Sequence, residues 1–311
     1  MRKNLAILAL SNMAIHKPVL LQETIESLSL LAGTTAVDGT LGRGGHAQEI
    51  IKRISPGGTF IGIDVDEKAL LRNRAMFEPI AKELSVQTHF IKDNFRNLKE
   101  ILLTTGVVDV NAILLDLGFS SEQISESGRG FSFLRDEPLL MTLSGDASYT
   151  AIDLINSASP EELEEILRNY GEEQFARNIS QEIVKRRRET PITKTFELVE
   201  TVKAATPLWY HKRKIHPATK TFQAIRIAVN DELGALRDFL SQMPAVVAHK
   251  GRLAIISFHS GEDRIVKLQF VAWERSGVGK RVNKKAIKPT REEVLVNRRA
   301  RSAKLRVCEF I

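Results

Sequence analysis

The segment DGTLGRGGH, residues 38–46, decides the fold of this 311-residue chain. It follows the strand-like run Thr35–Asp38 and precedes Ala47–Ile54, in which isoleucines recur at helical spacing. Glycines allow the backbone to take positive φ angles and to approach a ligand closely. A loop between a strand and a helix lies at the carboxyl edge of a parallel sheet, where ligands of open α/β folds bind. The segment therefore predicts both an α/β fold and a ligand site.

Alternating strand-like and helical segments continue beyond this loop. The predicted strands are residues 59–64, 86–90 and 110–115, and a helix is predicted over residues 68–84. Strands that alternate with helices form parallel sheets with right-handed crossovers. We therefore expect an α/β fold with a mostly parallel sheet.

One long insertion interrupts this alternation. Residues 125–149 are loop-like and rich in Gly and Ser, whereas residues 159–205 have a charged helical pattern. The α/β pattern then returns with a helix predicted over residues 222–240 and a strand over residues 252–258. We expect a main α/β domain of residues 1–124 and 217–311 and an inserted helical subdomain of residues 125–216.

Positive charge is concentrated near the C-terminus. The net charge is +7, yet residues 278–311 alone hold eleven Lys and Arg against three Glu, so the rest is almost neutral. Two further basic clusters are Lys185–Arg188 and Lys212–Lys214, and the second follows Trp209 and Tyr210. Localised positive charge is typical of proteins that bind polyanions, and aromatic residues beside it suit base stacking. A merely solvated basic tail is the alternative interpretation.

The sequence argues against several classes of protein. The apolar run at residues 5–10 is far shorter than the ~20 residues that span a bilayer, so we expect no membrane association. The single cysteine, Cys308, rules out an internal disulfide framework and fits a cytoplasmic location. The seven histidines show no metal-binding spacing, which disfavours a catalytic metal. Neither a G-x-S-x-G elbow nor a P-loop sequence occurs, which argues against hydrolases and NTPases.

Two cofactors compete for the glycine-rich loop. Asp64 follows about twenty residues later, at the end of the next predicted strand, where an acid binds the ribose hydroxyls of an adenosine cofactor. Residues 42–47 fit the dinucleotide pattern G-x-G-x-x-A, which leaves NAD open. Against NAD, Asp38 would repel a pyrophosphate, and His46 occupies the helix start where that group sits. An acid before the glycines can instead receive the ammonium group of S-adenosyl-L-methionine.

The segment Asp116–Phe119 follows another predicted buried strand and is expected to face the same crevice. Methyl transfer to the exocyclic amine of a base requires an acceptor for the amine hydrogens and a surface that aligns the ring. Asp116 and Phe119 offer these groups and are the candidate catalytic residues. In the alternative interpretation, Asp116 only caps a loop and Phe119 belongs to the core. Residues 257–264 gather further polar groups, either as a buried hydrogen-bond network or as a substrate contact.

Eight segments in order resemble the RsmH (MraW) family of bacterial ribosomal RNA methyltransferases. These segments are residues 16–21, 38–46, 62–66, 116–123, 129–133, 216–227, 256–267 and 299–306. The resemblance runs from His16 almost to the C-terminus. It implies a class I S-adenosyl-L-methionine-dependent methyltransferase fold, Rossmann-like, whose inserted helical subdomain recognises the substrate.

The resemblance also implies a reaction and a set of site residues. A methyl group would pass from S-adenosyl-L-methionine to the N4 amine of one cytidine in the decoding region of 16S rRNA, in the small ribosomal subunit. The residues expected to bind the cofactor are Gly44, Gly45, His46, Asp64, Phe95, Asp116 and Gln123. Within this set, residues 44–46 would contact the methionine part, Asp64 the ribose and Phe95 the adenine.

The chain departs from the family pattern at a few positions on the expected substrate side. Leu140 and Thr142 replace an acid and an arginine. Gly261 replaces a leucine, and Lys220 replaces an arginine, which loses the bidentate fork of a guanidinium. These changes concern substrate affinity and base choice more than cofactor identity.

A non-catalytic rRNA-binding assembly factor and an NAD-dependent oxidoreductase stay open as alternative functions. A homodimer stays open as the oligomeric state.

Overall fold

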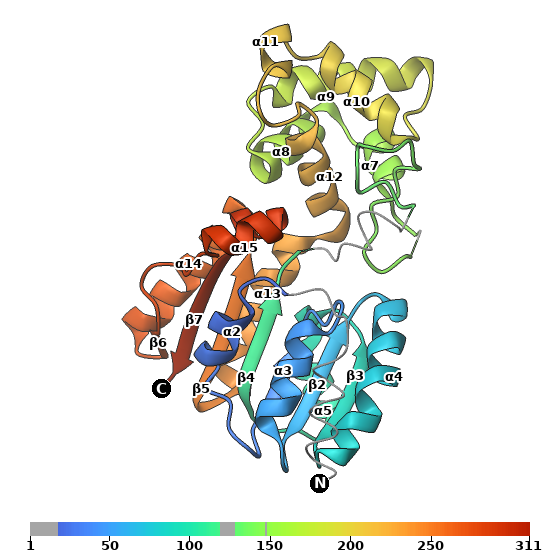
Figure 1. Cartoon of the computed structure of the whole chain (residues 1–311). Coiled ribbons are helices and arrows are strands. Elements are labelled where there is room, and N and C mark those ends of the chain that lie inside the picture. The colour runs from blue at the N-terminus through green and yellow to red at the C-terminus, as the bar shows by residue number, and fades with distance from the viewer. Residues whose placement is uncertain (1–17, 119–127, 147) are drawn as a thin grey trace. The chain divides into compact units, whose positions relative to one another are not determined.

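The structure, a computed structural model, describes residues 18–118, 128–146 and 148–311 (Figure 1). The chain divides into two compact units, the first of residues 1–118 and 234–311 and the second of residues 119–233. The expected site residues Phe119 and Gln123 lie outside the described residues, as does the apolar run at residues 5–10. Among the described helices, none has the length and apolar character that a membrane span requires.

A seven-stranded sheet forms the centre of the first unit. Its strands are β1 (Thr35–Asp38), β2 (Thr59–Asp64), β3 (Gln87–Lys92), β4 (Val110–Asp116), β5 (Val247–Ser257), β6 (Gly279–Arg281) and β7 (Lys304–Phe310). The order is β3-β2-β1-β4-β5-β7-β6, with β7 antiparallel to both neighbours and the pairs among β1 to β5 parallel. This mostly parallel sheet confirms the predicted fold class. The dinucleotide-binding fold has the order 3-2-1-4-5-6, so the antiparallel β7 between β5 and β6 distinguishes this sheet from it.

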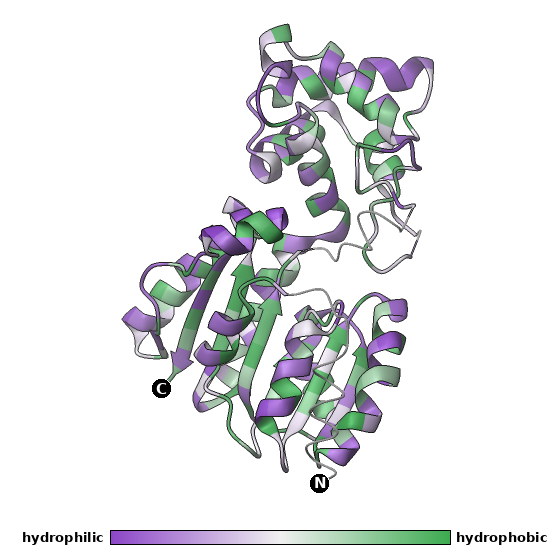
Figure 2. Ribbon diagram, in the orientation of Figure 1, coloured by the Kyte–Doolittle hydropathy of each residue, from purple (hydrophilic) through white to green (hydrophobic). Residues whose placement is uncertain are grey.

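Helices cover both faces of the sheet (Figure 1). The helices of this unit are α2 (Leu21–Ser27), α3 (Gly45–Ile54), α4 (Glu67–Glu83), α5 (Leu98–Thr105), α13 (Glu232–Val246), α14 (Ser260–Ser276) and α15 (Arg291–Val296), with short 3-10 turns η1 (Phe95–Asn97) and η2 (Arg298–Ser302). Successive strand residues point to opposite faces. Accordingly, Ala36 joins the core formed with α2, α3 and α4, whereas Val37 joins the core formed with α5, α13 and α14. Figure 2 shows the hydrophobic residues along the strands between these two layers.

The second unit is helical and has a core of its own. Its helices are α7 (Ala151–Ser157), α8 (Pro160–Gly171), α9 (Ala176–Glu189), α10 (Thr195–Ala204), α11 (Leu208–His211) and α12 (Thr219–Asn230). This unit extends to Leu233, whereas the sequence pattern places the end of the insertion at His216. The unit extends this far because α12 packs closely on α8. The two helices approach each other at Gly171, where an added Cβ would lie only 2.7 Å from the Lys220 carbonyl oxygen. Phe222 of α12 also belongs to the core of this unit.

The helix predicted over residues 222–240 is in fact two helices, α12 and α13. They meet at Asp231, which has a φ of 46° and caps the C-terminus of α12 in the left-handed region. Asp adopts this conformation more readily than most residues with a Cβ. The apolar spacing continues through the break, so periodicity alone does not reveal it.

Candidate functional site

The glycine-rich loop of residues 38–46 follows β1 and is attached to both neighbouring strands. The Gly39 amide donates to the Leu114 carbonyl oxygen of β4 at 2.9 Å. The Leu41 amide donates to the Ile63 carbonyl oxygen of β2 at 3.0 Å. The loop is therefore held at the carboxyl edge of the sheet by backbone hydrogen bonds, as the sequence predicts.

Gly44 is required by packing against α4. It has a φ of 78°, and a Cβ there would overlap Asn73 Oδ1 and the Phe77 ring. Asn73 is fully buried, and its Nδ2 donates to the Gly42 carbonyl oxygen at 2.8 Å. The loop and α4 thus fit together without room for a side chain, and α3 begins directly after Gly44, at Gly45. The sequence analysis did not single out Asn73.

Asp64 ends β2 with its carboxylate directed at the loop. Its Oδ2 accepts a hydrogen bond from the Gly42 amide at 2.7 Å, and its Oδ1 accepts one from the Asp66 amide at 2.9 Å. Burial raises the pKa of this carboxyl group above its usual value. Each carboxylate oxygen can accept a second hydrogen bond. Asp64 can therefore also bind a hydroxyl donor such as a ribose.

Asp38 and Asp116 end the adjacent strands β1 and β4 and are joined through Thr40. The Thr40 amide donates to Asp38 Oδ1 at 3.1 Å, and Thr40 Oγ1 accepts from the Asp116 amide at 2.6 Å. Burial, together with the nearby Asp64 charge, raises the pKa of Asp38 to about 7. Burial, together with the charges of Asp38 and Glu262, raises the pKa of Asp116 to about 8. Glu262 belongs to the polar segment 257–264 that the sequence places at this crevice, whereas the role of Thr40 was not predicted.

One oxygen of Asp116 is left without a partner. Asp116 Oδ1 is buried and has no hydrogen-bond partner among the residues that the structure describes. A buried carboxyl oxygen without a partner is unfavourable, because it has lost its hydration without gaining a hydrogen bond. A ligand that carries N–H groups or a positive charge would satisfy it. This orphaned atom makes the end of β4 a candidate binding site.

His46 is held next to Asp116 as a neutral ring. Its Nε2 lies 3.2 Å from the Val19 carbonyl oxygen, so Nε2 is the protonated nitrogen that donates. Burial lowers the pKa of His46 to about 4, which keeps the ring neutral at physiological pH. The other nitrogen, Nδ1, lies 3.7 Å from Asp116 Oδ2. The protein itself therefore fixes the orientation of this expected cofactor residue.

Phe95 lies beside the same loop. It begins η1, where the side chain of Asn94 accepts a hydrogen bond from the Arg96 amide. Its ring meets the Phe239 ring edge-on at 5.6 Å. A Cβ on Gly39 would come within 3.3 Å of Phe95 Cβ. The expected adenine neighbour is thus adjacent to the glycine-rich loop.

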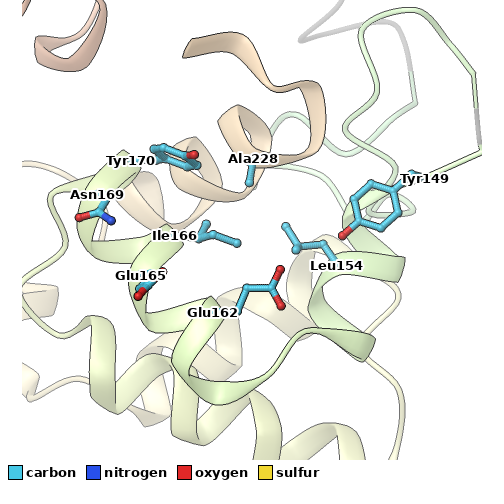
Figure 3. Close-up of a pocket in the computed structure, with 8 residues that line it drawn as sticks. All are labelled: Tyr149, Leu154, Glu162, Glu165, Ile166, Asn169, Tyr170 and Ala228. Atoms are coloured by element: carbon cyan, nitrogen blue, oxygen red, sulfur yellow. The ribbon is translucent and has the colours of Figure 1, made fainter. Parts of the chain in front are cut away.

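The second unit contains a hollow of about 270 Å³ that the sequence analysis did not anticipate (Figure 3). One face of α8 supplies most of its lining, including Glu162, Glu165 and Tyr170, and Tyr149 and Ala228 add to it. Carboxylates repel phosphate groups, so this hollow is a poor site for a nucleic-acid backbone.

The cations of the C-terminal segment are of two kinds. Arg306 and Lys304 pair with Asp263 at 2.7 and 2.8 Å, and Arg281 pairs with Glu274. These three hold α14 and the strands together. The other eight Lys and Arg of residues 278–311 are exposed, among them Arg298, Arg299 and Arg301 of η2.

Comparison with known proteins identifies the family of this chain. Residues 13–311 match the MraW methylase family. The chain belongs to this family. The curated relatives include the "Ribosomal RNA small subunit methyltransferase H" of Dictyoglomus thermophilum, which is 43% identical over 95% of this chain and 97% of that protein. The proteins of the same name from Dictyoglomus turgidum and Paenibacillus sp. are 44% and 42% identical over 95% and 94% of this chain, and over 97% and 98% of their own lengths.

Membership of the MraW family confirms the predicted resemblance and the prediction of a methyltransferase. The structure brings several of the expected site residues together. The carboxyl groups of Asp38, Asp64 and Asp116 lie around the loop that contains Gly44, Gly45 and His46. Phe95 adjoins this group. The roles of these individual residues stay predictions.

Proposed function

We propose that this protein transfers a methyl group from S-adenosyl-L-methionine to the N4 amine of a cytidine in the decoding region of 16S rRNA, in the cytoplasm. Membership of the MraW methylase family supports methyl transfer, and the names of the curated relatives support a small-subunit rRNA substrate. The observation that carries the proposal is the buried, unpartnered Asp116 Oδ1 beside Asp38 at the carboxyl ends of β4 and β1.

The residues of this crevice fit the cofactor. S-Adenosyl-L-methionine supplies a methyl group on a positively charged sulfonium, and it also carries an ammonium group and ribose hydroxyls. Asp38 would attract the positive charge, and Asp64 would accept the ribose hydroxyls. A pyrophosphate at the same place would meet the charges of Asp38, Asp64 and Asp116, so the electrostatics disfavour NAD.

Asp116 is suited to act on the amine that receives the methyl group. As the new N–C bond forms and the S–C bond breaks, the amine nitrogen becomes positively charged and must lose a proton. Asp116 would accept a hydrogen bond from the amine, which aligns its lone pair, and would then receive that proton. A pKa of about 8 places this carboxylate near the optimum for a general base at neutral pH. His46 Nδ1, which is unprotonated and lies 3.7 Å from Asp116 Oδ2, would be able to accept a hydrogen bond from Asp116 once Asp116 has taken up that proton.

The second unit and the exposed C-terminal cations would hold the RNA. We propose that the inserted subdomain of residues 125–216, which lies within the compact second unit, recognises the substrate. Exposed Lys and Arg bind phosphates through counterion release, so RNA affinity should fall steeply with salt. A base that is single-stranded or flipped out could then reach Asp116.

Two measurements test the proposal. Calorimetric titration of the purified protein with S-adenosyl-L-methionine and with NADH should show binding of the first only. Incubation with methyl-labelled cofactor and unmethylated small subunits should place label in 16S rRNA. Binding of NADH alone would favour an oxidoreductase, and cofactor binding without transfer to any ribosomal RNA would favour a non-catalytic assembly factor.

A further inference from the structure

We infer that the α11 surface, defined here as residues Leu208–Ile215, is a platform on which bases of single-stranded RNA stack. This inference rests on the proposed function, because it specifies how the RNA substrate is held. It assigns a binding role to Trp209 and Arg213, two residues that lie in the second unit.

The α11 surface is firmly attached to its own unit. The Tyr210 ring is buried, and its hydroxyl donates to Glu173 Oε2 at 2.7 Å, with both groups buried. The Tyr210 ring also meets the Phe175 ring at 5.0 Å in an edge-on arrangement. A helix of only four residues has little stability by itself, so these contacts fix its orientation. The residues beside Tyr210 are consequently presented in a defined geometry.

Large apolar side chains on this surface are exposed. Trp209 is 54% exposed, Leu208 is 78% exposed and Ile215 is 54% exposed. The chain has two tryptophans, and the other, Trp273, is buried against Phe270. An exposed tryptophan held beside other exposed apolar residues is typical of an interaction surface.

Three consecutive cations accompany the tryptophan. The Arg213 guanidinium lies 5.1 Å from the Trp209 ring and 5.1 Å from the Tyr210 ring. Lys212 and Lys214 are exposed, and within the part of the chain that the structure describes neither has a carboxylate at ion-pair distance. Glu173, which is near Tyr210, is buried and already bonded to it. The positive charge of this surface is therefore available to an anionic partner.

This combination favours single-stranded RNA over other polyanions. Aromatic rings and guanidinium planes stack on unpaired bases, and adjacent lysines contact the phosphates. A duplex hides the faces of its bases, and a polyanion without bases offers none. Phe196 of α10, an exposed aromatic residue elsewhere in the unit, is followed instead by Glu197 and Glu200. The lysine near it, Lys194, is already paired with Asp136.

Tryptophan fluorescence of the full-length protein tests the inference directly. The probes are a 12-nucleotide single-stranded RNA of mixed sequence, the same RNA in a duplex, and heparin. We expect the single-stranded RNA to quench the fluorescence of Trp209. In the Trp209→Ala protein, the emission should therefore no longer respond to the RNA. The Trp209→Ala protein should bind the single strand about tenfold more weakly, since stacking on an aromatic ring is worth about that much per base. Phe196→Ala is the matched control and should bind like the unaltered protein.

A second variant keeps the test independent of any local disturbance by Trp209→Ala. Replacing Lys212 and Lys214 by alanine should reduce the slope of log affinity against log salt by about 1.4, or about 0.7 for each lost phosphate contact. Unchanged affinity in Trp209→Ala, quenching equal for heparin and RNA, or no quenching at all would each overturn the inference. Binding of the labelled cofactor and methyl transfer to small subunits are measured separately, so failure of the stacking platform is distinguishable from failure of the proposed reaction.

Discussion

The carboxylate crevice of the first unit and the α11 surface of the second unit carry opposite charges in opposite environments. Asp38 is buried and Asp116 is partly buried, and burial raises the pKa of Asp38 to about 7 and that of Asp116 to about 8. Arg213 and its lysine neighbours are exposed. A buried charge interacts strongly with a ligand that complements it, because little solvent screens the interaction. Exposed charges act weakly one by one, and salt screens them.

This difference predicts which property each region determines. Changes in the crevice should alter cofactor binding and chemistry at any salt concentration. Changes in the α11 surface should alter RNA affinity in a salt-dependent way and leave cofactor binding unchanged.

The largest effect is expected for Asp116→Asn. Asparagine keeps the size of the side chain but cannot take a proton, so we expect the single-turnover rate of methyl transfer to fall about a thousandfold. Asp109→Asn, an exposed acid just before β4, is the matched control and should leave the rate unchanged. A rate for Asp116→Asn equal to that control would remove Asp116 from the chemistry.

Gly44→Ala should lower the free energy of unfolding by about 3 kcal/mol, measured by urea denaturation. The added methyl group would overlap Asn73 and Phe77, and alanine would be strained at a φ of 78°. Gly33→Ala separates these two causes, because Gly33 also has a positive φ but nothing within 4 Å of the new Cβ. We expect Gly33→Ala to lose about 1 kcal/mol. Equal losses would mean that packing of the loop on α4 contributes nothing.

Asp263→Asn should cost about 2 kcal/mol of unfolding free energy, because Arg306 and Lys304 would lose their partly buried partner. The salt dependence of RNA binding should stay the same, since these two cations serve the fold. Asp238→Asn, which breaks an exposed pair with Arg96, should cost less than about 1 kcal/mol. A changed salt slope in Asp263→Asn would show that the paired cations also contact RNA.

Cofactor affinity should depend on pH near neutrality. A positively charged ligand favours the ionised forms of Asp38 and Asp116 and lowers their pKa values, so binding releases protons. Affinity should therefore rise as the pH increases from about 6 to about 8, by up to about tenfold per pH unit for each group, and then level off. Calorimetry in buffers of different ionisation enthalpy measures the protons released. In Asp38→Asn the release should be smaller, and an unchanged release would exclude Asp38 as a contributor.

Much of the sheet could be predicted because its strands have strong local signals. The predicted strand over residues 59–64 matches β2, and the prediction over 110–115 differs from β4 by one residue. Asp38, Asp64 and Asp116 could be placed at one edge because the carboxyl ends of parallel strands coincide there. The break at Asp231 escaped prediction, because one residue with a positive φ ends α12 without changing the apolar spacing.

The structural roles of individual site residues were harder to predict than the strands. The glycines were expected to make room for a ligand, yet Gly44 makes room for Asn73 and Phe77. A signal existed: Asn73 lies between Leu70 and Phe77 on the buried face of α4, where an amide needs a hydrogen-bond partner. That the partner is Gly42, thirty-one residues away, is a tertiary fact that no local pattern contains.

The most direct test of the central claim is nucleoside mass spectrometry of 16S rRNA after reaction with the unaltered protein and with Asp116→Asn. We predict N4-methylcytidine in the rRNA treated with the unaltered protein. We predict almost no N4-methylcytidine with Asp116→Asn, although both proteins bind the cofactor. A methyl group on a ring carbon or a ribose, or equal N4 methylation by both proteins, would contradict it.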